Sequence, residues 1–439
     1  MPSRPRQADS HRVPRRVANL RSRRHQKKIS LPFQCTQDPP AILEEGCFPA
    51  QHARAWEKDF TEMEGHSSTL KMHSNAISKL PRALLMAVLG LQLSGLPAVA
   101  QSPPAPWSAP PSTIVVSEER QFRNGDVHLS GTLHLPQGRG PFPAVIVLHS
   151  ASSATRDLPL YRHLKQLLPV LGYAVFIYDR RGSGKSGGQR AGTDFNMLAD
   201  DGAAALRMLA ADKRIDPHRI GFWGLSQGGW LSVLASSRSP QAAFAISVSA
   251  PLVTPDIQMK FAVANLLRVK GFADDDIKEA ISTRAAVDDF MRGKGDRAAV
   301  ERLLAGAARK PWFRHSYISP MLEDPAHSQW AKEIALNPVT TLDRVHRPIL
   351  IVFGADDPWV PVRISAELLK AVAQRKPNLS YAVIAGANHE MATGVASEQE
   401  LDPAYATAFA PDAPAYFGIL TRWLSRLGEP PRHEGGRER

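Results

Sequence analysis

Six short apolar segments between residues 142 and 386 constrain the fold of this chain more than any other feature of its sequence. They are FPAVIVLHS (142–150), YAVFIYD (173–179), RIGFWG (219–224), AFAISVSA (243–250), PILIVFGA (348–355) and LSYAVIAG (379–386). Several are apolar at consecutive positions, which is typical of strands that are buried on both faces. Helical patterns such as LYRHLKQLLPVLG and DFNMLADDGAAALRMLAA separate the first three. Strands that alternate with helices predict a parallel sheet with helices on both faces.

Two opening strands and a helical insertion complete the predicted domain, which spans residues 113–428. STIVVSEERQF and VHLSGTLHLP, joined through the turn RNGD, predict the opening pair. Between residues 251 and 347 the alternation stops, and short helical patterns predict a cap over the carboxyl edge of the sheet. A surface excursion without a role in binding is the alternative. The apolar residues that could line a pocket under the cap are Phe261, Leu266, Leu267, Trp312 and Phe313.

The first hundred residues differ in composition from the rest. Residues 1–30 hold ten Lys or Arg and one acidic residue, so a basic arm for nucleic acid is one interpretation. Residues 72–100 combine a charged start, an apolar core and an Ala-Val-Ala cleavage site, which is typical of a secretory signal peptide. Because such peptides act at an N-terminus, Met72 is the expected start, and residues 1–71 are expected to be an unfolded or untranslated extension. We therefore expect export to the periplasm or the medium.

Removal of the leader would also lower the net charge of the protein and remove both of its cysteines. Residues 1–100 carry seven of the twelve net positive charges, and the mild remainder does not call for a nucleic-acid partner. The apolar core of the leader is too short for stable membrane insertion. Both cysteines, Cys35 and Cys47, precede the cleavage site, so no disulfide, thiolate metal site or cysteine nucleophile is expected. Residues 101–112 are predicted to be a Pro-rich linker and residues 429–439 a polar tail.

A serine flanked by glycines follows the strand 219–224 directly. In GLSQGG, Ser226 lies between Gly224 and Gly228. A serine on a tight strand-to-helix turn exposes its hydroxyl above the sheet, and side chains two positions away would collide with the crossing elements. The turn also leaves the N–H of Gln227 at a helix N-terminus, where a negative oxygen can be held. Ser186, in DRRGSGKSGG, shares the spacing but lies in a loop with no helical pattern after it. Ser226 is the predicted nucleophile.

A serine hydroxyl becomes a nucleophile only when a base takes its proton and a carboxylate orients that base. Asp356 and Asp357 come directly after the strand 348–355, and His389 comes directly after the next strand. The carboxyl ends of parallel strands meet at one edge of a sheet. The order serine, aspartate, histidine therefore predicts a catalytic triad in which either aspartate could be the acid.

These motifs together resemble those of the α/β-hydrolase superfamily. GLSQGG resembles its nucleophile elbow, GADDPWVP its acid loop, GANHEM its histidine loop and YDRRGSGKSGG its D-x-R-G-x-G-x-S loop. The resemblance implies a mostly parallel eight-stranded sheet with a cap between strands six and seven. It also implies Asp357 as the acid, and the N–H of Ala151 as an oxyanion donor beside that of Gln227. The elbow and the cap are most similar to the feruloyl-esterase and serine-aminopeptidase-like branches.

The predicted function is a carboxylesterase-like serine hydrolase that cleaves small-molecule esters of small or aromatic acyl groups through an acyl-enzyme. No metal or organic cofactor is expected, because HEMAT (389–393) is not H-E-x-x-H and Asp179 stands where a phosphate loop needs glycine. A peptidase or amidase would use the same triad, and a non-catalytic binding protein on a hydrolase scaffold is a third interpretation. A dehalogenase or epoxide hydrolase would have Asp in place of Ser226. The oligomeric state is not predicted.

Overall fold

The computed structural model of the chain describes residues 113–152, 154–402 and 410–428. The predicted upstream extension, signal peptide, Pro-rich linker and polar tail lie outside the described residues, as do Cys35 and Cys47. None of the described helices has the length and hydropathy needed to cross a membrane.

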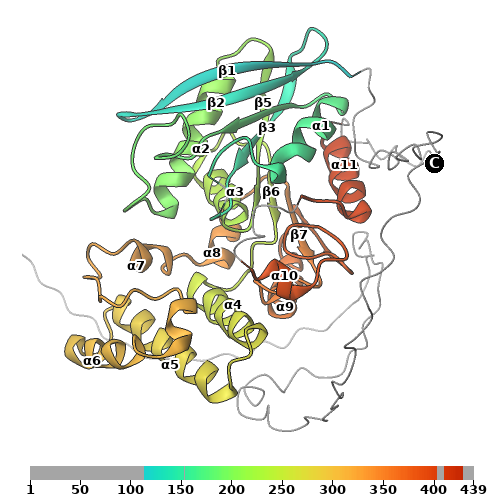
Figure 1. Ribbon diagram of the computed structural model, residues 1–439. Helices are drawn as coiled ribbons and strands as arrows, with labels where there is room; N and C mark the ends of the chain where they lie inside the picture. The colour runs from blue at the N-terminus through green and yellow to red at the C-terminus, as the bar shows by residue number, and fades with distance from the viewer. Residues whose placement is uncertain (1–112, 153, 403–409, 429–439) are drawn as a thin grey trace, which may run out of the picture. The chain divides into compact units, whose positions relative to one another are not determined.

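Eight strands form one sheet in the order β1-β2-β4-β3-β5-β6-β7-β8 (Figure 1). Their bounds are β1 Val115–Asn124, β2 Val127–Pro136, β3 Phe142–Leu148, β4 Ala174–Tyr178, β5 Ile215–Leu225, β6 Ala245–Val248, β7 Ile349–Gly354 and β8 Leu379–Ile384. β2 pairs antiparallel with β1 and β4, and all the other pairs are parallel. The predicted fold class, a mostly parallel eight-stranded sheet, is confirmed.

Helices cover both faces of this sheet because the central strands alternate between two apolar faces. Ile146 and Leu148 of β3 join a hydrophobic cluster with α2 and α3, whereas Val145 and Val147 join one with α1 and α11. The covering helices are α1 Arg162–Val170, α2 Phe195–Ala210, α3 Gln227–Arg238, α9 Val362–Ala373 and α11 Pro414–Gly428. Asp194 caps α2 by accepting a hydrogen bond from the N–H of Met197.

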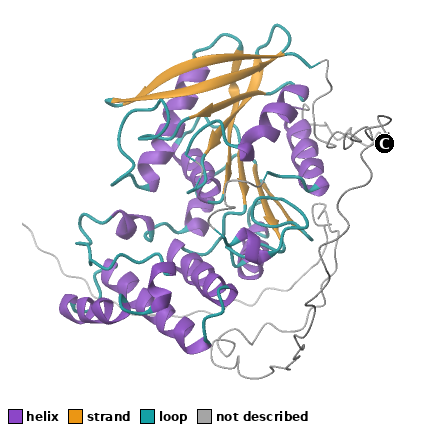
Figure 2. Cartoon of the chain, in the orientation of Figure 1, coloured by secondary structure: helices purple, strands orange, loops and turns teal. Residues whose placement is uncertain are grey.

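The predicted insertion between β6 and β7 is helical, and no strand occurs between residues 251 and 347 (Figure 2). Its elements are α4 Pro255–Val269, α5 Asp274–Met291, α6 Arg297–Ala307, the 3₁₀ helix η2 Pro311–His315, α7 Gln329–Glu333 and α8 Pro338–Asp343. Two hydrophobic clusters, one around Trp312 and one around Phe290, consist only of residues from this insertion. The cap therefore has an apolar core of its own.

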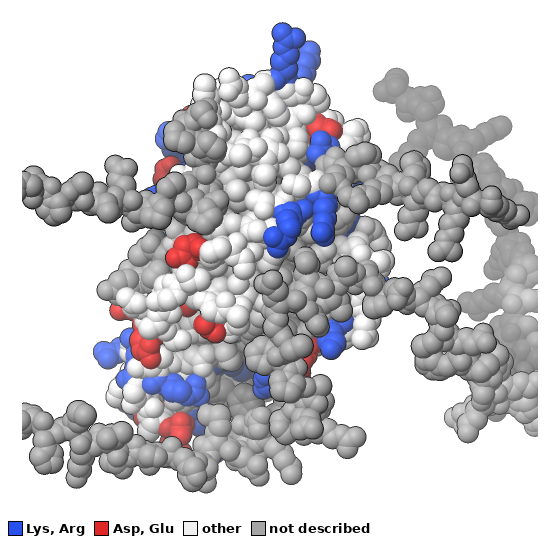
Figure 3. All heavy atoms as spheres, turned by 90° about the vertical axis from the view of Figure 1, so that its right-hand side faces the viewer, with Lys and Arg blue, Asp and Glu red and all other residues white. Residues whose placement is uncertain are grey.

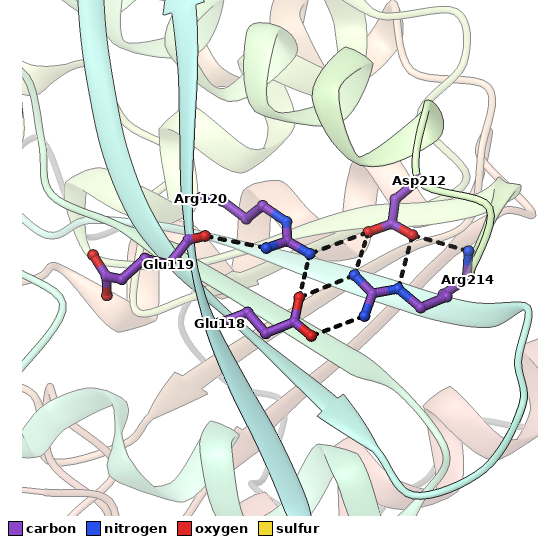
Figure 4. Close-up of polar contacts among 5 residues, drawn as sticks. All are labelled: Glu118, Glu119, Arg120, Asp212 and Arg214. Carbon is purple, nitrogen blue, oxygen red and sulfur yellow. Dashed lines mark hydrogen bonds and ion pairs between the residues drawn. The ribbon is translucent and has the colours of Figure 1, made fainter.

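A network of charged side chains fastens the edge strand β1 to the start of β5 (Figure 4). Arg214, directly before β5, donates to both carboxylate oxygens of Glu118 at 2.9 and 3.0 Å and to Asp212. Arg120 pairs with Glu118 and with Asp212. Hydrogen bonds from Arg214 hold the pKa of Asp212 below its usual range despite partial burial. The network therefore contributes its full stability above the ordinary pKa of a carboxyl group, and this contribution is lost progressively as the pH falls through the lowered pKa.

Charged side chains are dispersed over the face shown in Figure 3. Lys and Arg side chains lie in small groups there, with acidic side chains and wide uncharged areas between them. The described Lys and Arg side chains visible in this view therefore form separate groups and not a continuous stripe.

A buried ion pair fixes the loop after β4 to α2. Arg181 donates through Nε and Nη2 to the two carboxylate oxygens of Asp201, which is fully buried. Asn124 at the end of β1 donates to the same carboxylate at 2.8 Å. The carboxylate of Asp201 therefore joins β1, the loop after β4 and α2. Loss of its charge leaves the buried guanidinium of Arg181 without a counterion.

Replacement of Asp201 by asparagine should therefore destabilise the domain strongly. We expect Asp201→Asn to lower the free energy of unfolding by about 3 kcal/mol or more, the usual effect of breaking a buried pair. The preceding residue provides the control: Asp200 pairs with Arg238 at the surface, and Asp200→Asn should cost less than about 1 kcal/mol. Guanidinium denaturation of both variants measures the difference. Equal losses would contradict the structural role assigned to Asp201.

Candidate active site

Ser226 occupies the turn between β5 and α3. Its backbone has φ 58° and ψ −123°, which is rare for a residue with a side chain. The N–H of Ser226 donates to the carbonyl oxygen of Val248 at 2.7 Å and anchors the turn to β6. Gln227 is the first residue of α3, so its N–H has no acceptor within the helix. The side chain of Ser226 is half-buried, at the carboxyl edge of the sheet.

The glycines around Ser226 allow the turn to pack against the end of β3. A Cβ atom on Gly228 would lie 2.1 Å from the carbonyl oxygen of Leu148, and one on Gly224 would lie 1.9 Å from that of Gly228. Neither position can hold a side chain without a backbone shift. This close approach brings the N-terminus of α3 to the loop that contains Ala151.

Asp357 and His389 are hydrogen-bonded at the same edge. The Nδ1 atom of His389 lies 2.7 Å from Oδ2 of Asp357, and both side chains are buried. The other carboxylate oxygen of Asp357 accepts from the N–H groups of Trp359 and Val360 at 2.8 and 3.0 Å. Asp356 is exposed, and its carboxylate does not contact His389. It is therefore Asp357 that orients the imidazole, with Nε2 as its free nitrogen.

The acid and histidine loops approach each other as closely as the elbow and β3 do. A Cβ atom on Gly354 would lie 2.2 Å from the carbonyl oxygen of Asn388. The N–H of Asp356 donates to the carbonyl oxygen of Ala387 at 3.0 Å. No hydrogen bond joins Ser226 and His389 in the structure. In unliganded hydrolases this contact is often long and tightens when substrate binds.

Two further carboxyl groups surround His389. Oε1 of Glu400, in the short helix α10 Ser397–Glu400, accepts from the N–H of His389 at 2.9 Å. Glu390 is the next residue along the chain, and both glutamates are buried. One oxygen of each, Oε2, has no hydrogen-bond partner among the described residues. Three carboxyl groups thus surround a single imidazole.

This cluster shifts the pKa values of its members. Burial acts to lower the pKa of His389, but Asp357, Glu400 and Glu390 together raise it to about 9. Burial raises the pKa of Glu390 to about 7 and that of Glu400 to about 8. The imidazolium form is therefore stabilised, which is the form that arises when a histidine takes a proton from a nucleophile.

Ala151 lies in the loop after β3 and is exposed, and the start of this loop at His149 approaches Gly228 of the elbow. The preceding His149 is buried, and its ring contacts the hydroxyl of Tyr161 at 2.9 Å and the carbonyl oxygen of Tyr178. Since a carbonyl oxygen only accepts, Nε2 of His149 carries the proton. Both ring nitrogens are engaged, so His149 supports the loop and cannot act as a base there.

Ser186, which shares the spacing of Ser226, has a structural position. Its Oγ donates to the carbonyl oxygen of Asp179 at 2.6 Å and accepts from the N–H of Ser130 at 3.0 Å. The first bond closes the loop after β4, and the second holds this loop against β2.

Of the five cap residues predicted to line a pocket, three lie in the hydrophobic core of the cap. Leu267 and Trp312 are fully buried in one of the cap's hydrophobic clusters, and Phe313 packs against it. A cavity of about 310 Å³ lies inside the cap, and neither the five predicted residues nor the three candidate catalytic residues line it. The sequence analysis missed Glu390, Glu400 and the charged residues of this cavity. The only available indication for Glu390 was its position next to His389.

Within the described residues, no group of three or more His, Cys, Asp or Glu side chains is arranged to hold a metal ion.

Curated proteins match the chain over different lengths. A 2-(acetamidomethylene)succinate hydrolase of Mesorhizobium japonicum is 28% identical over 256 residues, which covers 57% of this chain and 83% of that protein. The quorum-quenching protein AidA of Acinetobacter baumannii is 30% identical over 128 residues, 29% of this chain and 41% of its own length. An uncharacterized 31.7 kDa protein of Escherichia coli is 23% identical over 55% of this chain and 82% of that protein.

Solved structures resemble the chain at low identity. An esterase of Pyrococcus furiosus matches with a TM-score of 0.46 and 18% identity, over 71% of this chain and 91% of that one. An acylaminoacyl peptidase of Pyrococcus horikoshii matches with a TM-score of 0.46 and 13% identity, over 74% of this chain and 43% of that one.

The family model described as serine aminopeptidase, S33, matches residues 143–394, which is more than half of the chain. This match runs from β3 to the loop after His389 and includes Ser226, Asp357 and the whole cap. The chain therefore belongs to the S33 serine aminopeptidase family of α/β hydrolases.

Proposed function

We propose that this protein is a serine hydrolase that cleaves carboxylic esters of small or aromatic acyl groups through an acyl-enzyme. The observation that carries the proposal is the 2.7 Å contact between Asp357 and His389. It lies at the carboxyl edge of the sheet, where Ser226 occupies a strained turn. A buried aspartate–histidine pair at the same edge of the sheet as a half-buried serine is the arrangement that activates a hydroxyl.

In this mechanism His389 moves one proton in each direction. Its Nε2 takes the proton from Oγ of Ser226 as the oxygen attacks the ester carbonyl, and the imidazolium then gives that proton to the departing alcohol. Water, deprotonated by the same nitrogen, attacks the acyl-enzyme and releases the carboxylic acid, which restores Ser226. Asp357 holds the ring in the required tautomer and stabilises its positive charge throughout.

The negative oxygen of each tetrahedral intermediate needs hydrogen-bond donors that are already in place. The N–H of Gln227 supplies one, since it is the first residue of α3 and the positive end of the helix dipole adds to it. The N–H of Ala151 supplies the second. The contact of Gly228 with the end of β3 supports this pairing, because it holds the two loops together.

The cap supports a preference for small substrates. Gln258 and Asn265 of α4 donate to the carbonyl oxygens of Trp359 and Pro358 at 3.0 and 2.9 Å. These two hydrogen bonds hold the cap against the loop of Asp357. A cap fixed beside the acid restricts the space for long acyl chains and favours compact ones.

Amide hydrolysis is the second candidate. The same three side chains cleave either bond, and one relative is named for a substrate that contains an acetamido group. The family description also names an aminopeptidase. A non-catalytic binding protein is the third candidate, and the complete Ser226–His389–Asp357 set argues against it.

The decisive experiment measures turnover and covalent labelling together. Wild-type protein should hydrolyse p-nitrophenyl acetate and butyrate faster than the palmitate ester or aminoacyl anilides, and a fluorophosphonate should label it. Ser226→Ala should abolish labelling and lower kcat by several orders of magnitude, up to about 10⁶.

Ser237→Ala is the control, since Ser237 lies on the same helix and donates only to the carbonyl of Leu234. A Ser226→Ala protein that kept a tenth of the activity would refute the nucleophile. Faster cleavage of the anilides would favour the amidase, and no labelling of the wild type would favour a binding protein.

Neighbouring aspartates test the acid. Asp357→Asn should lower kcat by about 10⁴, because asparagine stabilises the wrong tautomer of His389. Asp356→Asn should change kcat less than about twofold, since its exposed carboxylate does not contact the histidine. Steady-state kinetics at one pH compares the two variants. A larger loss of kcat in Asp356→Asn would assign the acid to Asp356 in place of Asp357.

Glu400 tests the acidic surroundings of His389. With the pKa of His389 near 9, kcat/KM should rise with pH as the imidazolium loses its proton. Because burial raises the pKa of Glu400 to about 8, its charge develops in the same pH range. Glu400→Gln keeps an oxygen for the N–H of His389 but removes the negative charge. The rise of kcat/KM should therefore occur about 0.5–1 pH unit lower than in the wild type.

The matched control is Glu398→Gln, an exposed residue of the same short helix. Its pH profile should coincide with that of the wild type. An unchanged or upward-shifted profile for Glu400→Gln would show that the carboxyl group of Glu400 does not act on the histidine.

A further inference from the structure

The cavity inside the cap has the composition of a ligand site. It measures about 310 Å³, at the lower end of the range for small-molecule pockets. Its apolar wall comes mainly from α4, α5, α6 and the segment 317–322, and includes Met259, Met291, Leu304 and Trp330. Methionine side chains adapt to ligands of different shape. Arg284, Asp288 and Glu323 add charge to this wall.

Arg284 is a buried cation without a carboxylate partner. Only 4% of it is exposed, yet no carboxylate oxygen lies within 4.0 Å of its guanidinium in any ion pair of the described residues. Nη1 donates to the carbonyl oxygens of Ser316 and Tyr317 at 2.9 and 3.3 Å, and the guanidinium stacks 4.9 Å from the ring centre of Trp330. Nε has no acceptor. Buried charges in proteins are normally paired.

Of the other acidic residues around the cavity, Asp256 and Asp288 have partners in the cap, and Glu323 is exposed. Asp256 pairs with Lys260 at 3.0 Å and with Arg292 at 2.6 Å. Asp288 accepts from Nε1 of Trp330 at 2.8 Å and faces Lys260 at 3.8 Å. Asp256 and Asp288 are therefore in direct contact with Lys260 or Arg292, and act on Arg284 only from beyond ion-pair distance. Burial lowers the pKa of Arg284, and the charges of Asp288 and Asp256 oppose this shift.

We propose that the cap cavity binds a small amphipathic carboxylate, with its anionic end on Arg284 and its hydrocarbon part against Met259, Met291 and Trp330. The site lies outside the residues that carry the proposed hydrolysis, and binding there needs no turnover. The carboxylate supplies an acceptor for Nε of Arg284 and a direct ion pair, and the planar guanidinium suits its two oxygens. The apolar wall gains by covering the chain from water.

Calorimetric titration of the wild-type protein with octanoate tests the proposal. We expect saturable binding with one site, and binding at least about tenfold weaker for octan-1-ol, which lacks the charge. Arg284→Met should weaken octanoate binding by a similar factor, and Arg284→Lys should recover part of it. Arg302→Met, an exposed residue on α6, should bind as the wild type does.

A second variant covers the case in which Arg284→Met does not fold. Ser319 lines the cavity from an exposed segment, and Ser319→Trp should block octanoate without loss of the cap core. Absence of octanoate binding to wild type, equal binding of octan-1-ol, or unchanged binding in folded Arg284→Met and Ser319→Trp would each overturn the proposal. Hydrolysis of p-nitrophenyl acetate, measured in parallel, reports on the catalytic proposal independently.

Discussion

Contact between backbones at the carboxyl edge is the constraint on which the candidate site depends. Gly228 lets the N-terminus of α3 touch the end of β3, and Gly354 lets the acid loop touch the histidine loop. A methyl group at either position would separate loops that must place their donors and acceptors within a few tenths of an ångström. The sheet supplies the rigid support, since β3, β5, β6, β7 and β8 all end at this edge.

The surroundings of His389 serve chemistry at some expense of stability. Glu390 and Glu400 are buried, and each leaves one oxygen without a hydrogen bond in the described part of the chain. Such atoms lower the stability of a fold unless they are needed for another purpose. Their effect is to favour a positive charge on the imidazole. The site is thus more acidic than the minimal arrangement of one aspartate and one histidine requires.

The strands and the positions of the key side chains were predictable because they follow from local patterns. Buried runs predicted the strands, and glycine spacing separated Ser226 from Ser186. Asp356 and Asp357 could not be separated by residue reasoning, because only the turn made by the N–H groups of Trp359 and Val360 decides which carboxylate faces His389. Glu400 was not predictable, since it reaches His389 from eleven residues away through an irregular loop.

The cap differs from the sheet in how its contacts are distributed along the chain. Its two hydrophobic clusters draw on residues 259–334 alone, whereas β3 pairs with strands on either side that come from distant segments. Contacts between residues that are near in sequence close small loops and therefore form quickly. Segments held by such contacts often fold and unfold as a cooperative unit. The core of the cap can therefore change in sequence without changing the pairing of the strands, while the hydrogen bonds of Gln258 and Asn265 keep α4 on the loop of Asp357.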